Sequence, residues 1–119
     1  MTSILQQKTD DINGLPYLVK RSDEKRVYTF NASLFPEIIS GLQISSLVGS
    51  ITVTARGNVT ASTPPTLGTP AVGLTVIQVS IDAGDNEESY YLKAQAQLND
   101  ADSSVIDLEG MLYIRDPTV

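Results

Sequence analysis

The sequence contains no cysteine, no histidine and no tryptophan. Without cysteine and histidine, disulfide frameworks, thiolate nucleophiles and zinc sites with Cys or His ligands are excluded. A Ser-His-Asp triad and any histidine general base are excluded for the same reason. We therefore expect a protein that is not an enzyme, with no catalytic, cofactor-binding or metal-ligating residues and no cofactor.

Positive charge and long apolar runs are also scarce. Eight Lys and Arg stand against 14 Asp and Glu, a net charge of −6. This balance argues against a nucleic-acid partner, because neutralising phosphates needs a basic face. The longest nearly apolar stretch, residues 38–55, is interrupted by serine, threonine and glycine, whereas a membrane helix needs about 20 mostly apolar residues. The first ten residues lack the pattern of a secretory signal. We expect a soluble protein with no membrane and no small-molecule substrate as partner.

What the sequence does contain fits one folded domain. It has 119 residues, of which 41% are hydrophobic and 18% charged, which is typical of a globular protein. Residues 1–26 carry a net charge of +1, from five cations and four carboxylates, and residues 27–119 carry −7, from three and ten. Apolar residues are sparse in the first segment. We predict an extended N-terminal arm over residues 1–25 and a β-sandwich domain over residues 26–119, and the arm has two interpretations: a solvated tail or a segment that docks on a neighbouring subunit.

Apolar and polar residues alternate along most of the second segment. Residues 90–99 alternate from Tyr90 to Asn99, and residues 106–115 repeat the pattern, which predicts two half-buried antiparallel strands. A third strand is predicted from Leu74 to Asp82, and short helical structure at residues 36–39 with Ser33 as its cap. Further β segments are predicted at residues 26–31, 42–48 and 50–56. Residues 60–73 hold three prolines and two glycines and predict a long loop or edge crossover. About six or seven short strands are typical of an antiparallel β-sandwich.

The candidate functional residues are contact residues for another protein. Tyr91 and Tyr113 fall on the polar side of adjacent predicted strands, where they favour a cross-strand pair or a protein interface. In the arm, apolar residues would anchor it and basic residues would meet an acidic surface on another copy. The predicted partner-binding residues are Leu15, Tyr17, Val19, Lys20, Arg21, Lys25, Arg26, Tyr91 and Tyr113.

Three other interpretations are weaker. The acidic residues 82–88 offer oxygen ligands for calcium, but a solvated turn is the commoner role of such a segment. Asp107 and Glu109 share one strand face, as a glycosidase pair would, but alternate charges on a strand normally face solvent. Tyr90 and Tyr91 invite a carbohydrate-binding or adhesin interpretation, although aromatic residues make up only 6% of the chain.

An ordered series of short motifs resembles the small phage fibre-tail adaptor family. Residues 20–35 (KRSDEKRVYTFNASLF) are similar to the opening turn and Tyr-x-Phe strand of that family, and residues 44–48 to its Ile-x-Ser-x-x-Val segment. Residues 73–76, 82–98 and 111–116 are similar to its later strands and acidic turn. The chain departs from the pattern at Asn31, at Phe35, in lacking the proline of the opening turn, and in the length of residues 60–73.

The resemblance implies an immunoglobulin-like β-sandwich that is a non-enzymatic structural protein of a bacteriophage virion. It implies an adaptor that joins fibres to the tail or neck through contacts with other virion proteins and with neighbouring copies in a ring. It also implies synthesis in the host bacterial cytoplasm. A capsid decoration or cement protein, and another tail or baseplate ring component, remain alternatives.

Overall fold

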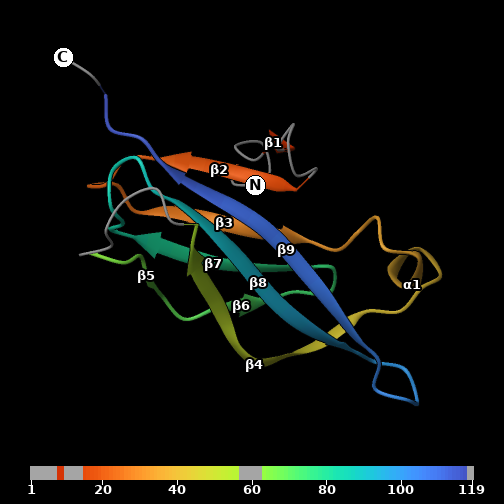
Figure 1. The fold of residues 1–119 in the computed structure, drawn as a ribbon. Coiled ribbons are helices and arrows are strands. Elements are labelled where there is room, and N and C mark those ends of the chain that lie inside the picture. The colour runs from red at the N-terminus through yellow and green to blue at the C-terminus, as the bar shows by residue number, and fades with distance from the viewer. Residues whose placement is uncertain (1–7, 10–14, 57–62, 118–119) are drawn as a thin grey trace.

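The computed structural model describes residues 8–9, 15–56 and 63–117, which form two β-sheets packed face to face (Figure 1). One sheet has the strand order β1-β2-β9-β8-β4, and the other has the order β3-β7-β5 with β6 also paired to β7. The all-β sandwich predicted from the sequence is confirmed. The elements are β1 (Lys8–Thr9), β2 (Pro16–Lys20), β3 (Arg26–Asn31), α1 (Pro36–Ile39), β4 (Ile44–Ala55), β5 (Thr66–Leu67), β6 (Ala71–Val72), β7 (Val76–Asp82), β8 (Ser89–Leu98) and β9 (Val105–Ile114).

The strand order of the two sheets is similar to that of immunoglobulin domains. If β3, β4, β5, β7, β8 and β9 are taken as strands B to G, the sheets contain B-E-D and C-F-G, as in immunoglobulin domains. Tyr90, near the start of β8, also makes the hydrogen bond of a tyrosine corner: its hydroxyl accepts the backbone N–H of Asp85 at 3.1 Å. It donates in turn to the Asp85 carboxylate at 3.2 Å. The corner ties the turn between β7 and β8 to the core without a disulfide.

The core lies between the two sheets and follows the alternation in the sequence. In β7, β8 and β9 every second side chain points inward and is buried, because successive residues of a strand face opposite sides. Tyr28 and Phe30 of β3 add an aromatic pair with ring centroids 4.7 Å apart. The largest fully buried side chains are Leu18, Tyr28, Ile77, Val79, Ile81, Tyr90, Leu92, Leu98, Leu112 and Ile114, together with Lys20 and Glu88.

Tyr28 of β3 connects the two sheets, and its ring packs closely against Gly110 of β9. Its hydroxyl donates to the carbonyl of Pro16 at the start of β2, at 3.0 Å. A Cβ atom added to Gly110 of β9 would lie 1.6 Å from that hydroxyl oxygen. Burial raises the pKa of Tyr28 far above its usual value, so the hydroxyl stays protonated and donates. Gly110 is therefore required by close packing, because only a residue without a side chain leaves room for the Tyr28 ring.

The predicted boundary between arm and sandwich at residues 25 and 26 is wrong. β2 pairs in parallel with β9 over Tyr17 to Lys20, opposite Met111 to Ile114, and Leu18 is a core residue. Pro16–Lys20 is thus a strand of the sandwich. Parallel pairing with a strand almost 100 positions away leaves no local signal in the sequence. The rest of the predicted arm, apart from β1, Leu15 and the turn after β2, lies outside the described residues.

Three local predictions also change. The sequence predicts two separate β segments at residues 42–48 and 50–56, but the structure has one strand there, β4. Its pairing with β8 shifts register near Gly49, which has a φ of 65° that suits glycine. Within residues 60–73, the described part contains the short strands β5 and β6 at the sheet edge. Helix α1 occurs where predicted, but its N-cap is Phe35, without a side-chain cap. Ser33 lies too far upstream to cap it.

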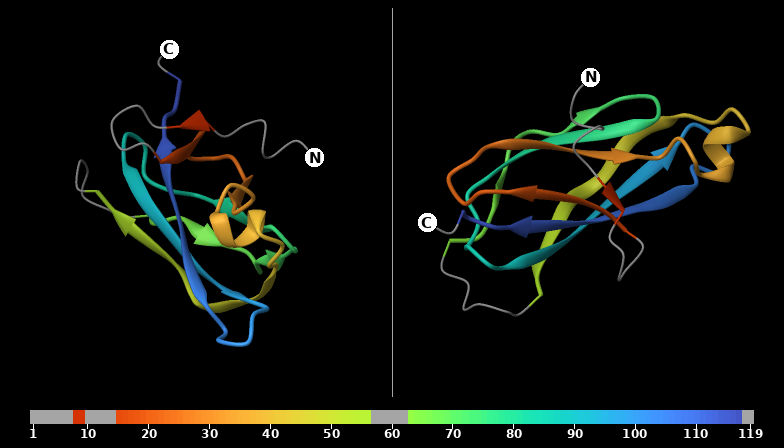
Figure 2. Two further views of the ribbon diagram at one scale, coloured as in Figure 1. Left: turned by 90° about the vertical axis from the view of Figure 1, so that its right-hand side faces the viewer. Right: turned by 90° about the horizontal axis from the view of Figure 1, so that it is seen from above.

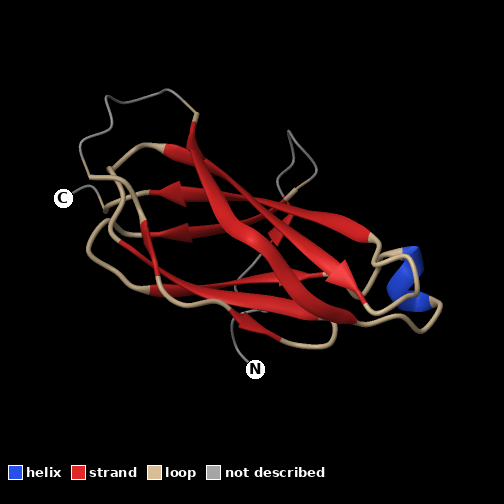
Figure 3. Ribbon diagram, turned by 90° about the horizontal axis from the view of Figure 1, so that it is seen from below, coloured by secondary structure: helices blue, strands red, loops and turns tan. Residues whose placement is uncertain are grey.

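The molecule is elongated, with a longest dimension of 52 Å. Helix α1 and the turn between β8 and β9 lie at one end, and the turns from β2 to β3 and from β7 to β8 lie at the other (Figures 1 and 2). Figure 3 shows the same arrangement from below, with the helix beyond the ends of the strands. The outer face of the β2-β9-β8-β4 sheet runs between these two ends.

Candidate protein-binding surface

The outer face of the larger sheet is built by the residues that alternate with the core residues. The strand register aligns them in rows across the sheet: Tyr17, Met111 and Tyr91 form one row, and Val19 and Tyr113 belong to the next. The predicted outward positions of Tyr91 and Tyr113 are therefore confirmed. Two residues assigned to the arm join them because β2 is part of the sheet.

The aromatic side chains of these rows are in contact. The rings of Tyr17 and Tyr113 are 5.4 Å apart in an edge-to-face arrangement, a geometry that aromatic pairs prefer. Met111 is only 4% exposed although it belongs to the outer face, because it lies between Tyr17 and Tyr91 in the register. Val19 is 43% exposed. The result is a continuous aromatic and apolar area on an otherwise polar sheet face.

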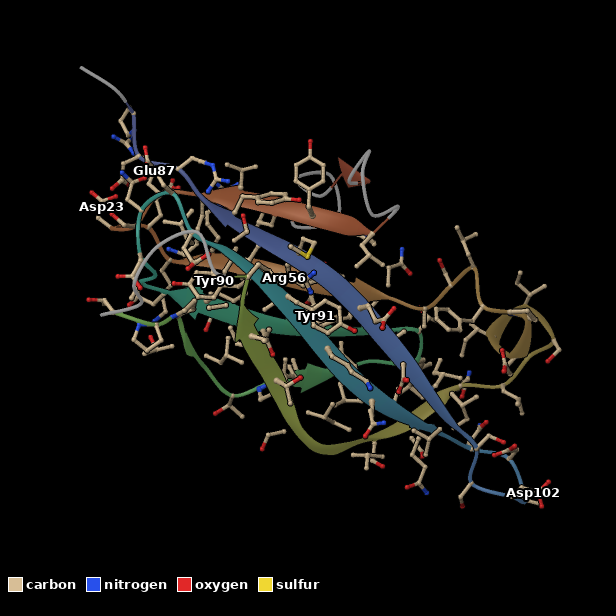
Figure 4. The ribbon with its side chains drawn as sticks, in the orientation of Figure 1. Asp23, Arg56, Glu87, Tyr90, Tyr91 and Asp102 are labelled. Carbon is tan, nitrogen blue, oxygen red and sulfur yellow. The ribbon has the colours of Figure 1, made fainter. Side chains whose placement is uncertain are left out.

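Two arginines stack on the tyrosines. The guanidinium carbon of Arg56 lies 6.0 Å from the centre of the Tyr91 ring, and that of Arg115 lies 5.3 Å from the Tyr113 ring. Both distances fit cation–π contacts. Figure 4 shows Arg56 above Tyr91 on this face, while Tyr90 belongs to the opposite side of β8. We call this surface the tyrosine–arginine face; it consists of Tyr17, Val19, Arg56, Tyr91, Met111, Tyr113 and Arg115.

Hydrogen bonds hold parts of the tyrosine–arginine face in place. Arg115 donates to the carbonyl oxygens of Ile114 and Glu88, at 2.7 and 3.0 Å, and to the hydroxyl of Ser89 at 3.3 Å. The Tyr91 hydroxyl donates to the carboxylate of Glu109. Burial, followed by that hydrogen bond and by nearby negative charge, raises the pKa of Tyr91 to about 12. These hydrogen bonds restrict the side chains of Tyr91 and Arg115, and a restricted side chain loses less conformational entropy when it enters a contact.

The other half of the same sheet face is polar. Lys93 pairs with Asp107, with the lysine nitrogen 3.5 Å from a carboxylate oxygen, and Gln95 donates to Asp107 at 3.0 Å. Asp107 and Glu109 are both exposed. Among the described residues, no group of three or more acidic side chains is placed to hold a metal ion. The contrast limits the tyrosine–arginine face to the half of the sheet that contains β2.

The basic residues of the predicted contact set lie elsewhere, and one of them is unavailable. Lys20 was predicted to meet another copy, but it is 1% exposed and donates to the carbonyl oxygens of Arg21 and Glu24, at 2.6 and 2.8 Å. Burial lowers its pKa. This prediction is wrong, because β2 directs the Lys20 side chain into the molecule.

The remaining basic residues follow β2. Arg21 and Lys25 are exposed in the turn before β3. Arg26 begins β3 and pairs with Glu24, with 3.6 Å between the charged groups. The structure therefore does not bring these three together with the tyrosines. Sequence reasoning found four members of the face and missed Arg56, Met111 and Arg115. The alternation placed Met111 and Arg115 on the outer side of β9, but nothing in it marked them as neighbours of tyrosines.

A cavity of about 170 Å³ lies beside the start of β2. Leu15, the remaining predicted contact residue, lines it together with Pro16 and Phe35, and Asp107 and Glu109 contribute carboxylates. Leu15 is half-buried, and no residue of the tyrosine–arginine face lines this cavity.

Comparisons with known proteins give no match: no family model matches the chain, and neither does any curated protein or solved structure. In the part of the chain that the structure describes, no helix is long and apolar enough to cross a membrane.

Proposed function

We propose that this protein is a non-enzymatic structural protein that assembles through the tyrosine–arginine face. The observation that carries the proposal is the gathering of three of the chain's five tyrosines with a methionine and two arginines on half of one sheet face. Tyrosine, methionine and arginine are the residues enriched in protein–protein interfaces. Tyrosine and arginine are also frequent among the residues that supply most binding energy.

We further propose that the assembly is a bacteriophage virion and that the protein is an adaptor joining fibres to the tail or neck. The resemblance of residues 20–116 to the small phage fibre-tail adaptor family supports this setting. The sandwich supports it as well, because a rigid sheet presents a binding face with little loss of conformational entropy. A decoration protein of the capsid, or a ring component of the tail or baseplate, would use the same kind of face.

Carbohydrate binding is less well supported by the geometry. A sugar stacks on the open face of an aromatic ring, but Arg56 lies over Tyr91 and Arg115 over Tyr113. The third tyrosine of the face, Tyr17, contacts Tyr113 through an edge-to-face arrangement. Stacking of a sugar on Tyr91 or Tyr113 would therefore require the arginines to leave. Protein side chains with carboxylate or apolar groups fit the face as it stands.

The test is to locate the protein on purified particles from its source with gold-labelled antibody in the electron microscope. We expect label at the tail or neck. Label spread over the shell would replace the adaptor with a decoration protein. Particles without any label would overturn the virion proposal. In the same source, a Val19→Asp, Arg56→Glu variant should fold but fail to enter particles, whereas Lys93→Ala on the polar half should enter normally.

A further inference from the structure

The end of the molecule that carries α1 exposes large apolar side chains. Leu34, just before α1, is 85% exposed, Ile39 at the end of α1 is 69% exposed, and Leu74 in the turn between β6 and β7 is 61% exposed. Backbone hydrogen bonds hold these segments together: Ile44 donates to the carbonyl of Leu74 at 2.8 Å, and Ala32 to that of Thr75 at 2.9 Å. The three exposed side chains therefore belong to segments that lie at the same end of the molecule, and exposed apolar area of this kind is typical of interaction sites.

The same end carries only negative charge. The segments that form it, residues 32–43, 73–76 and 98–105, contain three carboxylates and no lysine or arginine. Asp100 is held by hydrogen bonds from Ser104, which lower its pKa. Glu37 and Asp102 make no ion pair with any described residue, and Figure 4 shows Asp102 at the extremity of the molecule. We call this surface the apolar acidic end; it consists of Leu34, Glu37, Ile39, Leu74 and Asp102.

The tyrosine–arginine face carries positive charge, whereas the apolar acidic end carries negative charge. Arg56 is exposed and makes no ion pair with any described residue, and Arg115, over Tyr113, adds a second positive charge to the same face. The carboxylate of Glu109, on the neighbouring strand β9, accepts the hydrogen bond of Tyr91. Exposed apolar area on Val19 and the tyrosines lies on the same face as both arginines. An apolar surface with carboxylates at its margin is the partner that this face fits in both hydrophobicity and charge.

We infer that the apolar acidic end of one copy docks on the tyrosine–arginine face of a second copy of this chain. This inference rests on the proposed function, because it names the occupant of the same face. The two surfaces differ and lie on different parts of the molecule, so the contact is heterologous. Each added copy leaves one free end and one free face, and such contacts close into rings or continue as filaments.

Sedimentation velocity on the full chain, from micromolar to millimolar concentration, tests the inference with two variants. Leu34→Asp, Ile39→Asp alters only the end, and Val19→Asp, Arg56→Glu alters only the face; all four positions are exposed. Wild type should sediment as species larger than its 12.8 kDa monomer, in proportion to concentration. Each variant alone should stay monomeric. An equimolar mixture should give a one-to-one dimer and nothing larger, because it contains one intact end and one intact face.

The matched control is Val27→Asp, an exposed apolar residue on β3, which should associate as wild type does. Circular dichroism and thermal melting check that each variant is folded. Monomeric wild type at every concentration, a mixture of the variants that forms no dimer, or dissociation caused by Val27→Asp would each overturn the inference. The two proposals fail separately: absence of self-association removes the second copy as occupant, whereas only the particle labelling decides the virion function.

Discussion

The five tyrosines of the chain divide into an inner pair and an outer trio, and the two groups make different contacts. Tyr28 and Tyr90 are buried, and their hydroxyls bind backbone groups that fix a strand start and a turn. The outer trio lies on the sheet face, where the rings contact each other or an arginine. Tyr90 and Tyr91 are adjacent in sequence, so the alternation of a strand alone places one tyrosine in the core and the other on the outer face.

The largest loss of stability should come from Gly110→Ala, which disturbs the packing of the inner tyrosine Tyr28. The added methyl group would lie 1.6 Å from the Tyr28 hydroxyl oxygen and 2.6 Å from the ring carbon that bears it. Because one partner must move, we expect the free energy of unfolding to fall by about 3 kcal/mol. Urea denaturation followed by circular dichroism measures it. In a Tyr28→Phe background the same substitution should cost less, and equal costs in both backgrounds would contradict this packing.

The next largest effect should come from Tyr90→Phe. It removes the hydroxyl that accepts the Asp85 N–H and donates to the Asp85 carboxylate. A hydrogen bond contributes about 0.5–1.5 kcal/mol, and one to a charged group contributes more, so the free energy of unfolding should fall by about 1–3 kcal/mol. Tyr113→Phe is the matched outer variant and should change the free energy of unfolding by less than about 0.5 kcal/mol. Equal losses in the two variants would show that the inner and outer hydroxyls are not distinguished.

A smaller effect should be a loss of stability at high pH that comes from Tyr91. Its pKa is raised from 10.0 to about 12 in the folded protein, so between these values the folded state holds a proton that the unfolded state has lost. Its contribution to stability is complete below pH 10 and is lost as pH rises through 12. The free energy of unfolding of wild type should fall relative to that of Tyr91→Phe across this range. A constant difference would contradict the raised pKa.

The smallest effect should come from the polar half of the face. Lys93→Ala removes an ion pair in which both side chains are at least 35% exposed. Such pairs are worth about 0.5 kcal/mol, so the urea midpoint should hardly move and self-association should be unchanged. A loss of association in this variant would extend the binding surface beyond the tyrosine–arginine face.

The sequence predicted the parts of the fold that depend on alternation. β8 and β9 occur within one residue of the predicted segments, and their inward side chains, from Tyr90 to Leu98 and from Ile106 to Ile114, are buried as expected. The candidate site was predicted only in part. Tyr17 and Val19 were assigned to an arm, and their place beside Tyr113 comes from a parallel pairing between distant strands. No periodicity within either strand encodes that pairing.

Local sequence thus determined which side of each strand faces the core, because a strand has a period of two residues whatever its neighbours are. The composition also excluded thiolate and imidazole chemistry, because the sequence contains no cysteine and no histidine. Only the tertiary structure decided which strands lie side by side. That pairing buried Lys20 and Met111, placed Arg56 over Tyr91, and brought residues of β2, β8 and β9 together on one outer face. The pairing of strands depends on the burial of apolar side chains between the two sheets, and residues from the whole chain contribute to that burial.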